Sequence, residues 1–116
     1  MKHLLLAFAI LAGPAAFAQS VPATAYEFLT VAELQAQQDG LAKLQFAPAF
    51  QGKTEIQLER LPGTISAAKY MGAYRHNMEV VNQQLEAVTA AGWELVHVSS
   101  SPVMSGHEFL FRRPKK

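Results

Sequence analysis

One periodic stretch limits the folds open to this chain more than any other feature. Between residues 67 and 88, apolar side chains recur at alternating spacings of four and three, which places them on one face of a helix. The members of this stripe are Ala67, Met71, Tyr74, Met78, Val81, Leu85 and Val88. Gly92 follows and can adopt the left-handed conformation that commonly ends a helix. The pattern predicts an amphipathic helix that packs on another element, with Met78, Val81, Leu85 and Val88 in the contact.

The start of this helix is open from sequence alone. Thr64 or Ser66 could cap one long helix, although Gly72 would then cost about 1 kcal/mol in its interior. Asn77 could instead cap a shorter helix. We predict a helix over residues 77–91 and leave the upstream part undecided.

Around the helix, the sequence indicates extended segments. After Gly92 the apolar period changes to two, so residues 93–98 and 107–113 are predicted to be antiparallel strands, with Leu95 and Val96 filling the two faces. Residues 25–34, 44–50 and 55–61 also read as extended, and Pro48 demotes the second of these to an edge strand or a loop. We therefore expect an α+β fold in which a small antiparallel sheet of about 4–5 strands packs against one main amphipathic helix.

The first residues have the composition of a cleavable secretory signal. Lys2 precedes a wholly apolar run over residues 4–12, and Ala16 and Ala18 then place small side chains at a cleavage site. We predict a signal peptide over residues 1–18, a disordered leader over 19–24 and a single α+β domain over 25–116. The expected location is periplasmic or secreted. The apolar run is shorter than the ~20 residues of a membrane span, so no span should remain after cleavage.

Composition narrows the partners and the chemistry. The chain has 10 Lys and Arg and 9 Asp and Glu, so loss of Lys2 would leave the two signs balanced. This balance argues against a nucleic-acid partner, which favours a basic excess. The chain has no cysteine, which excludes disulfides and a cysteine nucleophile. Gly-x-Ser-x-Gly elbows and glycine-rich phosphate loops are also missing, so we assign no catalytic residue and no cofactor.

The C-terminal half resembles a known family. Residues 92–96 read Gly-Trp-Glu-Leu-Val, residues 109–113 form an aromatic strand that ends in two arginines, and Tyr26 and Glu27 open the first strand. In these features the chain is similar to a small bacterial family of unknown function. The resemblance implies a strand, a helix and two further strands, with residues 35–74 as an insertion, and it implies no catalytic residues. Trp93 itself is expected to pack in the core.

Two hypotheses for the function follow. The first is an exported, non-catalytic domain that binds a partner protein or a small ligand, or associates with itself as a homodimer. The alternative is a periplasmic binder of a copper-type metal, because thioether and imidazole groups suit copper. The candidate metal ligands are His76, Met78, His97, Met104 and His107.

Overall fold

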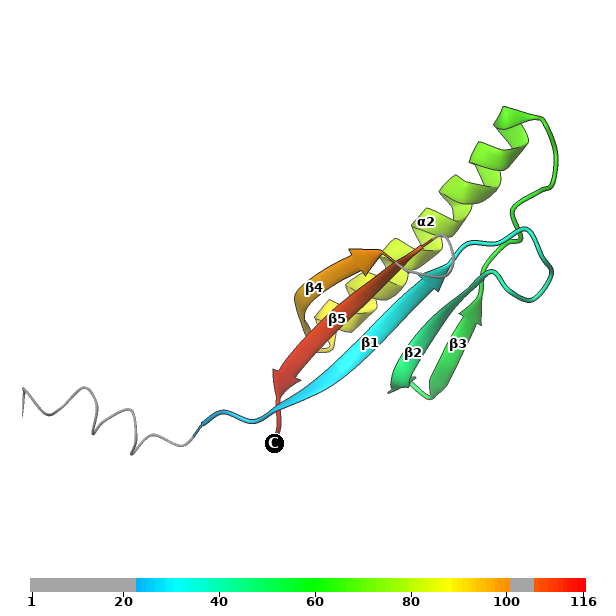
Figure 1. The fold of residues 1–116 in the computed structure, drawn as a ribbon. Coiled ribbons are helices and arrows are strands. Elements are labelled where there is room, and N and C mark those ends of the chain that lie inside the picture. The colour runs from blue at the N-terminus through cyan, green and yellow to red at the C-terminus, as the bar shows by residue number, and fades with distance from the viewer. Residues whose placement is uncertain (1–22, 101–105) are drawn as a thin grey trace, which may run out of the picture.

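The described part of the chain is built from five strands and one helix (Figure 1). The computed structural model describes residues 23–100 and 106–116. Its elements in chain order are β1 (Tyr26–Leu34), β2 (Lys43–Phe50), β3 (Lys53–Gln57), α2 (Ala67–Ala90), β4 (Glu94–Ser100) and β5 (His107–Pro114). The predicted signal sequence and nearly all of the predicted leader lie outside the described residues, as does Met104. Within the described residues, no helix is long and apolar enough to cross a membrane.

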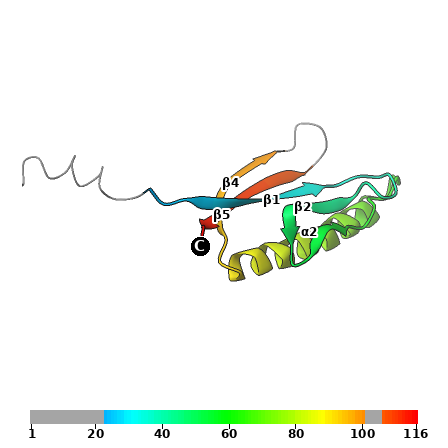
Figure 2. The same cartoon turned by 90° about the horizontal axis from the view of Figure 1, so that it is seen from below.

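The strands form one sheet in the order β3-β2-β1-β5-β4, and every neighbouring pair is antiparallel. Helix α2 lies on one face of this sheet, and no second layer of the described chain covers the other face (Figure 2). The predicted α+β class, with a five-stranded sheet and one helix, is confirmed. Strand β1 occupies the centre because the β2–β3 hairpin pairs with one of its sides and the β4–β5 hairpin with the other.

The core lies between the sheet and α2. Period-two alternation in β1 directs Leu29 and Val31 into the core and leaves Phe28 exposed on the opposite face. The residues with the least exposure come from most elements: Leu29, Val31, Leu44, Phe111 and Val88. Leu58 and Leu61 are also buried, although they follow the end of β3. The predicted strand over residues 55–61 was therefore placed too late, because its second half is a loop that fills the core.

Helix α2 is one continuous helix. Ser66 is its N-cap, with the side-chain oxygen accepting from the backbone nitrogen of Lys69 at 3.4 Å. The longer of the two sequence alternatives is correct, and Asn77 is an interior residue rather than a cap. The predicted contact face was wrong in part. The fully buried positions are Ala73, Asn77, Val81 and Val88, whereas Met71 and Met78 are exposed because α2 is rotated toward the loop that follows β3.

Two other strand predictions need correction. Strand β2 lies inside the sheet, so Pro48 does not mark a sheet edge. The proline is accommodated where the register between β2 and β3 shifts, between Gln45 and Phe50. Strand β4 is the edge strand on the other side. Leu95 and Val96 were expected to fill both faces, but they are 48% and 46% exposed because α2 does not reach over this edge.

Two consecutive arginines near the end of β5, Arg112 and Arg113, make contacts on opposite faces of the sheet. Arg113 donates to Glu27 at 2.6 Å and stacks over Trp93 at 4.2 Å, which closes the core beneath the helix end. The prediction that Trp93 packs in the core is confirmed. Arg112 stacks over Tyr26 on the opposite face, and its hydrogen bond to Glu94 raises the pKa of the guanidinium above its ordinary value.

Candidate functional site

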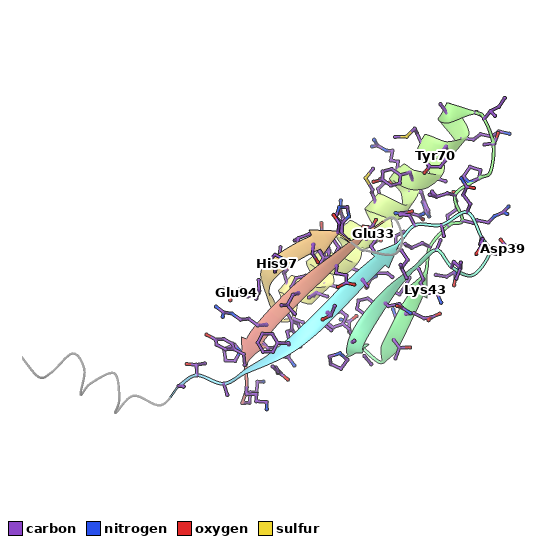
Figure 3. All side chains as sticks on the ribbon, viewed as in Figure 1. Glu33, Asp39, Lys43, Tyr70, Glu94 and His97 are labelled. Carbon is purple, nitrogen blue, oxygen red and sulfur yellow. The ribbon has the colours of Figure 1, made fainter. Side chains whose placement is uncertain are left out.

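A buried carboxylate near the end of β1 forms the centre of the candidate site. Glu33 continues the inward alternation of Leu29 and Val31, so its side chain enters the core side of the sheet and is only 7% exposed. Figure 3 shows Glu33 close to α2 and to the start of β5. Each carboxylate oxygen accepts one hydrogen bond, Oε2 from Gln35 Nε2 at 2.8 Å and Oε1 from His107 Nδ1 at 3.0 Å. The imidazole is the donor in this contact in the tautomer that carries the hydrogen on Nδ1.

Asn77 connects this carboxylate to the loop after β3. Its side-chain nitrogen donates to Gln35 Oε1 at 2.8 Å and to the Glu59 carbonyl at 2.7 Å, and its oxygen accepts from the Glu59 amide at 2.8 Å. Asn77 is fully buried, and within the described residues no buried side-chain polar atom lacks a partner. The position of Glu33 is therefore fixed through Gln35 by a chain of hydrogen bonds that reaches α2 and the loop.

A glycine permits the close approach between β1 and the start of β5. Gly106 has φ of 147° and lies against the backbone of Glu33, where an added Cβ would overlap the Glu33 carbonyl. This contact brings His107 beside the carboxylate. A side chain at residue 106 would push the two strands apart at the site.

A pocket of about 190 Å³ opens above Glu33, between α2 and β5. Its polar lining consists of the Glu33 carboxylate, the His107 imidazole and the Asn82 amide. Its other lining residues are Tyr74, Met78, Val81, Leu85 and Phe109. The pocket therefore has apolar and aromatic walls with one acidic group at its inner end.

Exposed apolar side chains continue from this pocket to the sheet edge. Phe109 pairs with Val98 and Phe111 with Leu95, so these β4 side chains lie on the helix side of the sheet. Val98 is 43% exposed. Met71 is exposed on α2, about two turns before Met78 and on the same side of the helix. We call the surface formed by Met71, Met78, Phe109, Val98 and Leu95 the α2–β4 trough.

The candidate metal ligands are distributed over several surfaces. Met78 and His107 line the pocket together. His97, on β4, pairs with Leu110 of β5, which alternates with Phe109 and His107 and therefore faces the opposite side of the sheet. His76 is exposed on another side of α2, and Met104 is outside the described residues. Among residues 23–100 and 106–116, no group of three His, Cys, Asp or Glu side chains is placed to hold a metal ion.

Sequence reasoning missed Glu33, although a signal for it exists. Glu33 is in phase with Leu29 and Val31, so the alternation that identifies β1 also places a charged residue on its buried face. Buried carboxylates need partners, which makes such a position a candidate site. Its partners His107 and Gln35 could not be found this way, because they come from other parts of the fold.

Comparison with known proteins gives no further assignment: no family model, no curated protein and no solved structure matches the chain. The resemblance to a small bacterial family therefore stays a prediction. Any function must be argued from the site itself.

Proposed function

We propose that this protein is an exported, non-catalytic binding domain that takes a segment of a partner protein into the α2–β4 trough. The observation that supports this most directly is the exposure of Met78, which lines the pocket, and of Val98, which pairs with the pocket residue Phe109. Met71 and Leu95 are exposed further along α2 and β4. Contiguous apolar surface of this kind is typical of interaction sites, whereas single exposed apolar residues are ordinary.

The size of the pocket favours a protein segment over a free small ligand. Pockets for drug-sized molecules have volumes of roughly 300–1,000 Å³. The pocket beside Glu33 has about 190 Å³, which suits one inserted side chain. The rest of such a partner segment would then lie along the trough.

The edge of β4 favours docking on the face rather than strand addition by a second copy. The β4–β5 register shifts between Leu95 and His97, so Val96 interrupts the regular edge. Bulges of this kind disfavour pairing with another strand. The homodimer therefore becomes an outcome to test rather than the leading proposal.

A site-specific crosslinking experiment tests the proposal. A photo-crosslinking residue at Met78 is compared with one at Thr54, which is exposed on β3, in cells that export the protein. The captured partner is then purified and its affinity is measured by calorimetry. We expect Val98→Asn to weaken binding about tenfold, corresponding to ~1.4 kcal/mol, and Thr54→Asn to leave it unchanged. Equal crosslinking at both positions, or equal affinity of both variants, would contradict the proposal.

Two further outcomes concern export and self-association. Intact mass of the periplasmic protein should correspond to an N-terminus at Gln19, and a product that retains Met1 would contradict export. Crosslinks between two copies of the chain, together with sedimentation that depends on concentration, would show that the trough binds a second copy of the chain instead of a partner protein.

A copper-type metal site is the second candidate, because Met78 and His107 line the same pocket. A metal bound at 100 times its dissociation constant would raise the free energy of unfolding by about 2.7 kcal/mol. Thermal unfolding with and without Cu(I), in the native chain and in Met78→Leu, measures this. An unchanged unfolding temperature would eliminate the candidate.

A further inference from the structure

Among residues 23–100 and 106–116, no lysine or arginine forms an ion pair with the Glu33 carboxylate. Within the described residues its only ion-pairing contact is His107, whose imidazole carries a charge only when protonated. Its other hydrogen-bond donor, Gln35, is neutral. A carboxylate that is 7% exposed is costly without a counter-charge, so the site favours a cation from outside.

The surroundings of the carboxylate fit a cation with a short apolar stem. No lysine or arginine of the described part of the chain lines the pocket. The aromatic rings of Tyr74 and Phe109 and the thioether of Met78 are groups that accommodate a cation at close range. Val81 and Leu85 offer apolar contact for methylene groups.

Resting on the function proposed above, we infer that the pocket selects a primary alkylammonium group, namely the end of a lysine side chain of the partner segment. Its ammonium would donate to Glu33, and its methylene groups would lie along Met78, Val81 and Leu85. An ammonium suits the site better than a guanidinium. Each Glu33 oxygen already accepts one hydrogen bond, which leaves room for a point charge rather than for a planar two-pronged donor.

The test uses small probes on the purified exported protein. Chemical shifts of backbone amides are followed by NMR during titration with n-butylammonium, n-butanol and butyrate at equal ionic strength. We expect saturable shifts around His107 and Phe109 with n-butylammonium, and binding at least about tenfold weaker for the other two probes. Glu33→Gln should remove the preference, whereas the matched control Glu55→Gln, on exposed β3, should keep it. Equal binding of n-butanol, or an unchanged preference in Glu33→Gln, would overturn the inference.

A second titration separates the inference from the proposed function. Capped Leu-Lys-Leu is compared with capped Leu-norleucine-Leu in the native chain and in Val98→Asn. We expect the lysine peptide to bind more tightly than n-butylammonium and to weaken in Val98→Asn, while n-butylammonium binding stays the same. If both peptides bind equally and depend on Val98, the lysine assignment is wrong and the trough remains a docking surface. If neither peptide exceeds n-butylammonium, a lysine of a partner segment is excluded.

Discussion

The two ends of the sheet differ in how they meet solvent. At one end, β2 buries Leu44, Phe46 and Phe50 in the core. The outer strand β3 exposes Lys53, Thr54, Glu55 and Gln57. At the other end, β5 is only partly covered, and the outer strand β4 exposes Leu95, Val96 and Val98. Both ends come from antiparallel hairpins of similar length, so the hairpin architecture does not explain the difference.

The contrast bears on the docking surface proposed above. Charged residues protect an edge strand against unwanted pairing, and β3 has them. Strand β4 instead keeps apolar residues next to a pocket, which lowers the solubility of a free protein unless a partner covers them. The difference between the ends supports the proposed docking surface, and four experiments test it.

The largest expected effect compares the same substitution at the two ends. Leu44→Ala removes a fully buried side chain on β2 and should lower the free energy of unfolding by about 2–5 kcal/mol. Leu95→Ala, at a half-exposed position on β4, should lower it by less than about 1 kcal/mol. Urea unfolding of the isolated domain measures both. Similar losses would mean that β4 is as well covered as β2.

A second experiment removes the hydrogen bonds that close the β3 end. Asn77→Ala leaves the backbone N–H and carbonyl of Glu59 without their partner and should cost about 2–3 kcal/mol in urea unfolding. The matched control is Gln83→Ala on the exposed side of α2, which should change stability by less than about 0.5 kcal/mol. A similar small loss in both variants would show that the loop after β3 does not depend on Asn77.

A smaller effect is expected at the start of α2, where the chain arrives from the β3 end. Ser66→Ala removes the N-cap and should cost about 0.5–1 kcal/mol, since the capping hydrogen bond is long at 3.4 Å. Circular dichroism during urea unfolding detects the change. If stability were unaffected, the first turns of α2 would contribute little to the fold.

The smallest change in stability should come from making the two edges alike. Lys53→Val combined with Glu55→Val gives β3 an apolar edge and removes the exposed Lys43–Glu55 ion pair. We expect a change in unfolding free energy of no more than about 0.5 kcal/mol, together with new concentration-dependent association in sedimentation. Val98→Lys on β4 is the converse and should reduce any association of the native chain. A monodisperse double variant would show that charge is not what protects β3.

Much of the fold could be predicted from local sequence patterns. The change of apolar period at Gly92 identified α2 and the β4–β5 hairpin, and the alternation in residues 25–34 identified β1. Trp93 was correctly placed in the core. The prediction of Pro48 as an edge or loop position was wrong, because a register shift inside the sheet accommodates it. The expectation for Pro48 rested on its missing backbone N–H. The shift in register between β2 and β3 depends on the neighbouring strand and could not be predicted from the proline itself.

The type and order of the elements follow from the sequence alone, because the period of apolar residues is a property of each segment. The rotation of α2 against the sheet was decided only by the tertiary structure. Both the stripe through Met71 and Met78 and the stripe through Ala73, Asn77 and Val81 are compatible with an amphipathic helix. The second is buried because Asn77 satisfies the backbone of Glu59, and Met78 of the first stripe is left to line the pocket. Hydrogen bonds between residues far apart in sequence therefore determine which stripe is buried. The same tertiary packing places His107 beside Glu33.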